Sequence, residues 1–414
     1  MGRVIVVGGG VAGLRCAGVL AEAGVEVVLL EAGERVGGRV RTDRRDGYLL
    51  DRGFQVLPTA YSEARSCLDL GDLDLHEFRS GVLVRRDGEF RALHDPLRHP
   101  GRLLETLRAG LGTVGDRARL VLWVAELLAG VEGAALRGRD VASRELLDRR
   151  GFSVEIVETF FRPFFGGVFL EPDLVTSGRM MEFVLRTFAA GPVALPAGGM
   201  EAIPRQLADG LPRDTVRTGA RVAAVEAGGT AVRLGDGGAV KGDAVVVATD
   251  PWTAAGLVPG VESPGRRSVT GLYFGADAPP VEDPVLVLNG EEDGPVNHLS
   301  VQSRVCPSYA PPGRELISVT VLRGASADDR DLEDAVRDEM RDWFGEEVDG
   351  WRLLRVDRIT SALPAAPPGA ISGEGAPSRV EPNLYVCGDH REHPSLEGAL
   401  VSGRRAAEAV LENL

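Results

Sequence analysis

Long apolar runs are missing from this sequence. The best candidate, Leu120 to Val131, is shorter than the roughly 20 residues that cross a bilayer, and it carries Glu126. An apolar strand is predicted from Arg3 onwards, which leaves no space for the charged and apolar regions of a secretory signal. We therefore expect a cytoplasmic protein in which Leu120 to Val131 is a core helix. The alternatives for this segment are peripheral contact with a membrane surface and the lining of an apolar tunnel.

Cysteine and lysine are scarce. The four cysteines, Cys16, Cys67, Cys306 and Cys387, lack the paired spacing of zinc sites and redox dithiols, so we expect buried, reduced thiols and no metal. Lys241 is the only lysine, and it is interpreted as a solvated charge in a turn. The formal net charge of −14 argues against a nucleic-acid partner, because phosphate backbones bind clustered cationic side chains.

The strongest motif present lies near the start of the chain. The apolar run 3–7 predicts a buried strand, and Gly8-x-Gly10-x-x-Gly13 follows it before a helix predicted over Val11–Glu22. The first glycine permits a tight turn, the second lets the backbone approach a pyrophosphate, and the third lets helix and strand pack closely. The helix N-terminus offers unpaired N–H groups to an anion. A second predicted strand, 25–30, ends at Glu31, a suitable position for a carboxylate that binds a ribose hydroxyl. The unit predicts a dinucleotide site.

Later segments extend this site. Gly37-Gly38 stands between Arg35 and Arg39, which adds bare backbone N–H groups and positive charge beside the same diphosphate. The segment Asp51-Arg52-Gly53 follows, and two further predicted strands end in Ala248-Thr249 and Gly388-Asp389. This repetition favours a long cofactor.

The motifs resemble those of the flavin-containing amine oxidase and phytoene desaturase superfamily, whose members carry the dinucleotide fingerprint, then Arg-x-Gly-Gly-Arg, then Asp-x-Gly. The resemblance covers the cofactor half of the chain well and the substrate half poorly. It implies FAD, with Asp389 on the ribityl chain, Val222 on the adenine and the last helix pointing its N-terminus at the flavin, where it stabilises negative charge. Because Cys387 lies within a predicted strand and matches no flavin-linking cysteine, the FAD is expected to be noncovalent. The predicted cofactor contacts are Gly8, Gly10, Gly13, Glu31, Arg35, Gly37, Gly38, Arg39, Gly53, Phe54, Gln55, Val222, Thr249, Gly388, Asp389, Gly398, Ala399 and Leu400.

The implied fold is α/β (α+β overall): a Rossmann-type FAD-binding domain of glutathione-reductase-like type, interleaved with a substrate domain of antiparallel sheet plus helices. The 44% of apolar residues suits two or more domains. The predicted FAD-binding domain comprises 1–60, 196–265 and 379–414, and the substrate domain comprises 61–195 and 266–378 with a helical insertion at about 100–150.

Two features of the substrate half carry further expectations. The apolar runs 269–274, 285–288, 298–302 and 315–321 predict successive antiparallel strands of one sheet. The phenylalanine-rich segment 160–169 is either core packing or a substrate wall. Gly166-Gly167 within it indicates a close backbone approach.

The reaction is inferred from what such a flavin site needs. No second strand-linked glycine fingerprint could hold a nicotinamide, so the substrate itself is the expected electron donor, with oxygen or a quinone as acceptor.

Amine oxidases of the superfamily usually place a lysine on the strand that corresponds to 269–274, and this strand has Thr270 and Gly271 instead. They also use an aromatic pair, but Tyr385 is the only aromatic residue after Ile359. We therefore expect hydride transfer from a C–H of a mainly apolar or conjugated organic substrate to flavin N5, as in a desaturase-like dehydrogenase. Two alternatives stay open: a flavin amine oxidase that produces imine and hydrogen peroxide, and an FAD-dependent non-redox isomerase or FAD-binding protein.

Three histidines are candidates for proton transfer, because imidazole exchanges protons near neutral pH. His390 and His393 lie between the ribityl acid and the last helix, and His298 begins a substrate-domain strand. The alternative for each is a loop or turn residue whose ring is satisfied by neighbouring groups, by FAD or by solvent.

Overall fold

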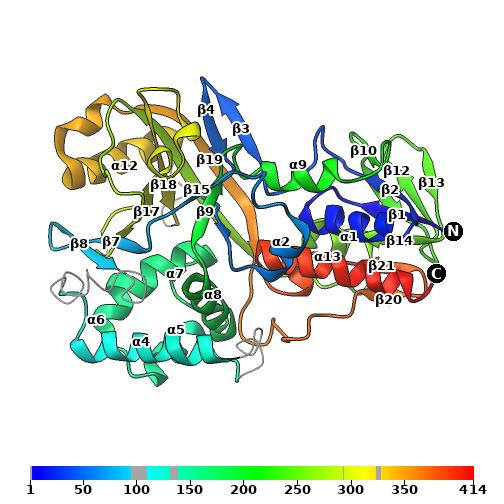
Figure 1. Ribbon diagram of the computed structural model, residues 1–414, viewed down its shortest axis with the longest axis horizontal. Helices are drawn as coiled ribbons and strands as arrows, with labels where there is room; N and C mark the ends of the chain where they lie inside the picture. The colour runs from blue at the N-terminus through cyan, green and yellow to red at the C-terminus, as the bar shows by residue number, and fades with distance from the viewer. Residues whose placement is uncertain (1, 95–109, 131–138, 292, 323–327) are drawn as a thin grey trace.

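Two large sheets organise the chain. The computed structural model describes residues 2–94, 110–130, 139–291, 293–322 and 328–414. A six-stranded sheet has the order β10-β2-β1-β14-β21-β20, and a seven-stranded sheet has the order β19-β15-β18-β17-β16-β7-β8. Figure 1 shows the first at the end of the molecule where both termini lie and the second at the opposite end, above a group of helices.

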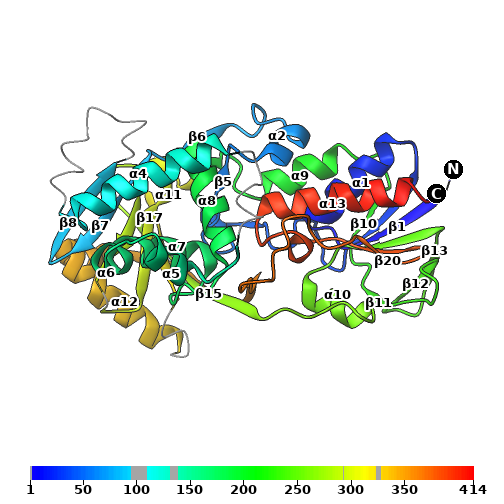
Figure 2. The same cartoon turned by 90° about the horizontal axis from the view of Figure 1, so that it is seen from below.

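The six-stranded sheet is parallel except at β20, and its central strands are apolar because both faces are covered. Helices α1 and α13 cover one face, where they lie side by side (Figure 2). A three-stranded meander and α10 cover the other. The helix predicted over Val11–Glu22 is confirmed with those bounds. The elements of this part are β1 (Arg3–Val7), α1 (Val11–Glu22), β2 (Glu26–Leu30), α9 (Ala202–Asp209), β10 (Val216–Arg217), β11 (Val222–Val225), β12 (Ala231–Leu234), β13 (Ala239–Lys241), β14 (Ala244–Val247), α10 (Pro251–Leu257), β20 (Arg379–Glu381), β21 (Leu384–Val386), η6 (Asp389–Arg391) and α13 (Leu396–Leu411).

The seven-stranded sheet packs one face on the amphipathic helix α12, through Leu272, Phe274 and Val319 among others. The predicted strands do share one sheet, but β15 pairs with β18 and β19 instead of its neighbour in sequence, and β16 pairs in parallel with β7. Its elements are β7 (Gly81–Arg86), β8 (Glu89–His94), β15 (Arg266–Ala276), β16 (Leu286–Asn289), β17 (Val296–Val301), α11 (Gln302–Val305), η4 (Pro307–Tyr309), β18 (Glu315–Val321), α12 (Asp329–Phe344), η5 (Gly345–Gly350) and β19 (Arg352–Pro364).

Strand β19 is 13 residues long. Its second half continues to pair with β15 as far as Pro364, which lies opposite Arg266. The long partner strand β15 supplies the hydrogen bonds that keep the segment extended.

A group of helices fills the remaining corner around a second core that contains Trp123, Phe161 and Phe165. The predicted helical insertion is matched by α4 and α5, while 102–109 and 131–138 of that prediction fall outside the described residues. The helices also continue beyond it to Ala190. They are α4 (Val114–Ala129), α5 (Ser143–Arg149), α6 (Val154–Ile156), the π-helical turn η3 (Val157–Phe161), α7 (Arg162–Phe169) and α8 (Gly178–Ala190).

A buried carboxylate ties these parts together. Asp51, with no exposed surface, accepts hydrogen bonds from the Thr42 hydroxyl (2.5 Å), the Met200 N–H (3.0 Å) and the Tyr309 hydroxyl (2.8 Å). The Tyr273 hydroxyl donates to the backbone carbonyl of Asp51 (2.5 Å). Asp51 lies in a small hairpin between the large sheets, so its partners join four separate segments. The connecting elements are β3 (Thr42–Arg45), β4 (Tyr48–Asp51), β5 (Leu57–Pro58), α2 (Ser62–Cys67), β6 (Leu75–Glu77) and β9 (Val193–Pro196).

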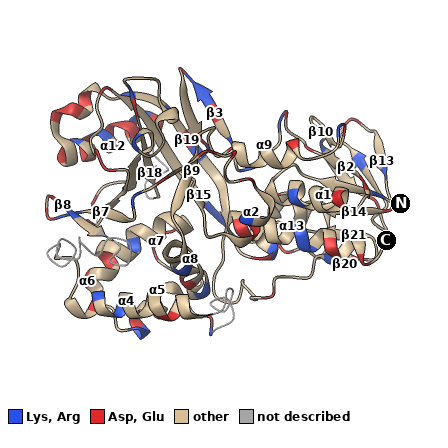
Figure 3. Ribbon diagram, in the orientation of Figure 1, with Lys and Arg blue, Asp and Glu red and all other residues tan. Residues whose placement is uncertain are grey.

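Charged residues of both signs are interspersed along the exposed elements, as α12 shows in Figure 3. None of the helices that the structure describes is long and apolar enough to cross a membrane. Within the same described residues, no group of three or more His, Cys, Asp or Glu side chains is arranged to hold a metal ion.

Candidate functional site

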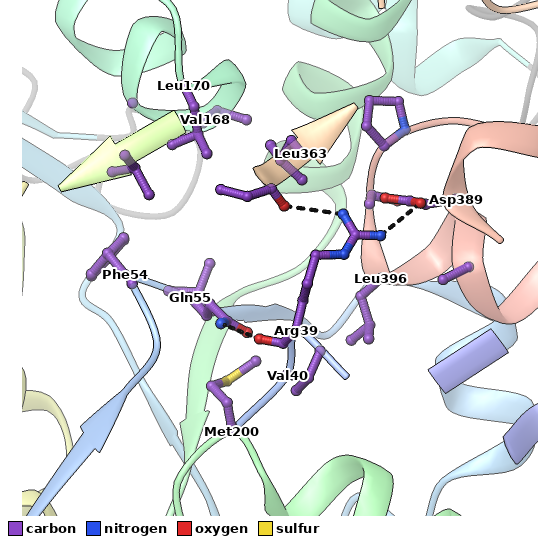
Figure 4. Close-up of a pocket in the computed structure, with 18 of the residues that line it drawn as sticks. Arg39, Val40, Phe54, Gln55, Val168, Leu170, Met200, Leu363, Asp389 and Leu396 are labelled. Atoms are coloured by element: carbon purple, nitrogen blue, oxygen red, sulfur yellow. Dashed lines mark hydrogen bonds and ion pairs between the residues drawn. The ribbon is translucent and has the colours of Figure 1, made fainter. Parts of the chain in front are cut away.

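A single cavity of about 1360 Å³ runs from the glycine-rich turn after β1 to the helices of the opposite corner. Pockets that hold drug-sized ligands have volumes of roughly 300–1,000 Å³. This cavity therefore has room for a dinucleotide and a second molecule. Figure 4 shows its middle part, with Phe54, Val168 and Leu170 on one side and Asp389 and Leu396 on the other.

Two glycine-rich turns form one end of the cavity and pack against each other. The Gly37 N–H donates to the Gly9 carbonyl (2.8 Å), and Gly37 has a φ of +118°. A Cβ built on Gly10 meets no atom within 4 Å, so this backbone faces open space. Gly10 is also the residue before α1, whose N-terminus receives no side-chain cap. Bare backbone beside an uncapped helix N-terminus suits a diphosphate, and these residues therefore fit the cofactor that the motif predicts.

Glu31 is fixed beside these turns. One carboxylate oxygen accepts from the Gly9 N–H and the other from the Gly33 N–H, both at 2.7 Å. Because Glu31 also lines the cavity, its carboxylate is held where a ribose hydroxyl could donate to it.

Arg39 crosses the middle of the cavity (Figure 4). Its guanidinium forms an ion pair with the buried carboxylate of Asp389 (2.7 Å) and donates to the Ala362 carbonyl (3.0 Å). The Gln55 amide donates to the Arg39 carbonyl (3.0 Å). Charge–charge attraction to Asp389 raises the pKa of Arg39 despite burial, which by itself lowers it. These contacts join the second glycine turn to the strand end at Gly388, and they make Arg39 and Asp389 one electrostatic unit.

Most of the predicted cofactor contacts do line the cavity. They are Gly8, Gly10, Glu31, Gly37, Gly38, Arg39, Gly53, Phe54, Gln55, Val222, Thr249, Gly388, Asp389 and Ala399. Their contact with FAD stays a prediction.

Four predicted contacts lie behind the cavity wall. Arg35 is not among the lining residues, and its guanidinium forms ion pairs with Asp43 and Glu201. A Cβ on Gly13 would lie 2.0 Å from the Gly8 carbonyl oxygen, and one on Gly398 would lie 2.1 Å from the His393 carbonyl oxygen. These two glycines therefore permit close backbone packing, as predicted for Gly13. Leu400 is fully buried in the core.

The three candidate histidines are separated by the fold, and of them His298 alone lines the cavity. His393 is buried behind it, in contact with the Phe183 ring (4.3 Å between centroids) and with the Ser395 hydroxyl (3.0 Å from Nδ1). Burial lowers the pKa of His393 and of His390 to about 4, and that of His298 to about 3. All three rings are therefore neutral near pH 7 and weak as bases.

The phenylalanine-rich segment and the described part of the predicted helix, which belongs to α4 (Val114–Ala129), each contribute both core and cavity side chains, while Val131 lies outside the described residues. Phe160 and Phe164 line the cavity while Phe161 is a core residue, and on α4 the cavity side chains lie beside the buried Trp123. Sequence reasoning missed the second half of β19 and helix α8 as walls. The apolar residues of α8 are visible in the sequence, but nothing local says what an apolar face will contact. The lining side chains in question are Leu120, Val121 and Val124 of α4, Met180, Val184, Leu185 and Phe188 of α8, and Asp357 to Leu363 of β19.

The glycine turns, the fixed carboxylate and the interleaved sheets define a flavin-dependent oxidoreductase. Residues 11–411 match the family of flavin containing amine oxidoreductases, and the chain belongs to that family. The predicted superfamily and α/β fold are thereby confirmed.

Individual relatives differ in how much of the chain they resemble. An L-amino-acid oxidase from the snake Crotalus adamanteus is 50% identical over 76 residues, which are 18% of this chain and only 15% of the snake enzyme. A hydroxysqualene dehydroxylase from Rhodopseudomonas palustris is 28% identical over 99% of this chain and 98% of its own length. Among solved structures, a protein from Exiguobacterium sp. 255-15 assigned as a protoporphyrinogen oxidase has a TM-score of 0.76 at 20% identity and covers 99% of both chains. At 20% identity, this structural similarity shows that the two proteins share a fold.

Proposed function

We propose that this protein binds FAD noncovalently and transfers hydride from a C–H of a mainly apolar or conjugated organic substrate to flavin N5, with oxygen or a quinone as electron acceptor. The observation that carries the proposal is the apolar half of the cavity. Beyond Phe54 its walls include helices α4, α7 and α8, and the side chains there include Val124, Phe164, Val168 and Val184. Such walls bury an apolar molecule favourably and offer little to a small polar one.

The cofactor half of the proposal rests on the order of groups along the cavity. The N–H of Ala220, two residues before Val222, donates to the Glu31 carbonyl (2.8 Å), a Cβ on Gly8 of the first turn would lie 3.1 Å from the Thr249 nitrogen, and Arg39 of the second turn reaches Asp389 (2.7 Å). This order fits the ribose, diphosphate and ribityl parts of FAD. Bound flavin would supply the hydride acceptor. The chain itself would hold the cofactor through backbone N–H groups and the Arg39–Asp389 pair, while its apolar walls orient the substrate and exclude water.

The substrate assignment has support from the wall composition and from one relative. The enzyme named hydroxysqualene dehydroxylase resembles this chain along nearly its whole length, and its name describes a long, mostly hydrocarbon molecule. The single lysine, Lys241, is exposed on β13 in the meander, so no lysine is available at the cavity for the arrangement usual in amine oxidases of the superfamily.

Anaerobic mixing tests the proposed reaction directly. We expect long polyenes or other conjugated hydrocarbons to bleach the visible flavin absorbance of the loaded protein, and simple amines to leave it unchanged. Bleaching by amines alone would contradict the proposal.

The second candidate, amine oxidation to imine with release of hydrogen peroxide, is favoured by the short match to an L-amino-acid oxidase. A flavin that no substrate reduces while product forms would instead indicate the non-redox alternative.

The Val124→Trp variant tests whether the far end of the cavity holds substrate. Val124 is half-buried and lines the cavity, so an indole there should shorten the space and lower the affinity for long apolar substrates by about tenfold, or ~1.4 kcal/mol. Flavin content should not change. Ala125→Trp is the matched control, because Ala125 is the next residue of α4 and is exposed. Unchanged affinity in Val124→Trp, measured by titration of the flavin spectrum, would show that this end of the cavity is not used, and equal losses in both variants would point to damage to α4.

A further inference from the structure

The inner face of β17 carries polar groups into an apolar region. His298 and Ser300 are two residues apart on this strand, so their side chains lie on the same face. Both are fully or almost fully buried. Among the described residues, neither the His298 Nε2 atom nor the Ser300 hydroxyl has a hydrogen-bond partner. Of these two residues, His298 lines the cavity. A buried, unpaired polar atom costs roughly 1–3 kcal/mol, so this ring is a position where a ligand could supply the missing partner.

The His298 ring is held firmly in place. Its Nδ1–Cε1 edge lies against Gly167 of α7, where a Cβ would stand 2.7 Å from Nδ1 and 2.9 Å from Cε1. This is the close backbone approach that the sequence predicted at Gly166-Gly167. The Phe54 ring packs edge-on against the imidazole, with 5.1 Å between centroids and 69° between planes.

Asn297 decides which nitrogen of His298 carries the proton. The Asn297 side-chain nitrogen donates to the Pro163 carbonyl (2.9 Å), which can only accept, so the amide cannot be turned around. The same nitrogen lies 3.0 Å from Nδ1 of His298. Its second hydrogen therefore points at Nδ1, which must accept, and the proton of the neutral ring resides on Nε2.

The neutral state is secured by burial, which lowers the pKa of His298 to about 3. The ring is thus a hydrogen-bond donor at Nε2 and not a base. The geometry does not favour a proton-transfer role for His298, because the ring nitrogen with a free lone pair already accepts from Asn297.

A neighbouring hydroxyl completes a small polar site. Thr320 of β18 is directly opposite His298 in the register, and Gly271 of β15 is opposite Thr320 on the other side. Directly opposed residues share one face of a sheet, and Thr320 lines the cavity together with His298. Asp357 of β19, which lies opposite Gly271, lines the cavity as well.

We propose that His298, fixed as the Nε2–H tautomer by Asn297 and assisted by Thr320, donates a hydrogen bond to an uncharged oxygen of the substrate, a hydroxyl, ether or carbonyl on an otherwise apolar molecule. The proposal rests on the proposed function for the identity of the cavity as the substrate site. An uncharged oxygen is specified because a carboxylate would lose its hydration without meeting positive charge on the neutral ring. By holding this oxygen at a fixed place in the cavity, the hydrogen bond would determine which carbon of the apolar chain lies next to the flavin.

Two measurements on the flavin-loaded protein test this site. In the first, nitrogen-15 NMR of histidine-labelled protein should show His298 with its proton on Nε2 and no titration between about pH 5 and 8, and Asn297→Ala should introduce the Nδ1–H form. In the second, titration of the flavin spectrum compares hexadecanol, hexadecane and palmitate. Wild-type protein should prefer hexadecanol over hexadecane by about tenfold, the equivalent of one buried hydrogen bond. His298→Phe should remove this preference, and His298→Gln, which keeps a donor, should retain part of it.

Several results would overturn the proposal. They are an Nδ1–H tautomer in the wild type, no preference for the alcohol in the wild type, an unchanged preference in His298→Phe, or palmitate binding as tightly as hexadecanol. The NMR result does not depend on a variant that must fold. Neither measurement needs turnover, so a flavin that no hydrocarbon bleaches would contradict the proposed reaction and leave the donor site standing.

Discussion

Replacing Gly10 with leucine is expected to lower flavin affinity by more than about 100-fold, or ~2.8 kcal/mol, while the protein stays folded. Gly10 has an ordinary backbone conformation (φ −75°, ψ 177°), and a Cβ there meets no protein atom within 4 Å. A leucine side chain would therefore strain nothing in the protein, but it would fill the space that a diphosphate needs in order to approach the backbone. Flavin content after purification and titration of the apoprotein with FAD measure the effect.

Gly18 gives this experiment its matched control. It lies within α1, the helix that begins directly after Gly10; a Cβ there also meets no atom within 4 Å, and Gly18 does not line the cavity. Gly18→Leu should keep the flavin and the fold, and its higher helix propensity should stabilise α1 slightly. Normal flavin content in Gly10→Leu would contradict the placement of the diphosphate, and equal loss in both variants would point to damage to the helix.

The Asp51→Ala variant is expected to have the largest effect on stability, a loss of about 3–5 kcal/mol in the free energy of unfolding. Removal of the carboxylate leaves three donors without an acceptor in the interior, namely the Thr42 hydroxyl, the Met200 N–H and the Tyr309 hydroxyl. Urea unfolding of the flavin-loaded protein measures the loss. Asp72→Ala, at an exposed position, is the control and should leave the unfolding midpoint unchanged.

Asp51 should also make stability depend on pH. Burial raises its pKa from 3.8 to about 6, against the opposing effect of its hydrogen bonds. Between these values the folded state binds more protons than the unfolded state, so this group's contribution to stability falls as pH rises through about 4 to 6, by up to about 3 kcal/mol. In Asp51→Asn the side chain stays neutral, and its stability relative to wild type should improve over the same pH range. A constant difference between wild type and Asp51→Asn would contradict the raised pKa.

The cofactor end of the site was predictable because its determinants are local. Gly8, Gly10 and Gly13 work through the shape of one turn and one helix, and Glu31 ends the next strand, so spacing along the chain fixes their arrangement. Arg35 shows the limit of this reasoning. Its contact with the diphosphate stays a prediction, but the structure pairs its guanidinium with Asp43 and with Glu201, and Glu201 is distant in sequence.

The substrate end could not be predicted in the same way. The chain shows that α4, α8 and the segment 160–169 have apolar faces, and an apolar face packs equally well on a core or on a ligand. Only the tertiary structure separates the side chains that face the core from those that face the cavity. It places Phe161 in the core and Phe164 at the cavity. It likewise brings together Cys16 and Cys387, whose thiols interact although they lie far apart in sequence.

The sequence by itself thus determined the family motifs, the dinucleotide turn and the absence of a lysine from the strand where amine oxidases of the superfamily carry one. Only the tertiary structure shows the protonation state and the surroundings of the three candidate histidines. All three are plausible proton carriers by residue type, but burial makes them neutral, the loop carries His390 and His393 behind the cavity wall, and Asn297 turns His298 into a donor. Protonation and tautomer depend on neighbours supplied by other segments of the chain, and no local pattern records those neighbours.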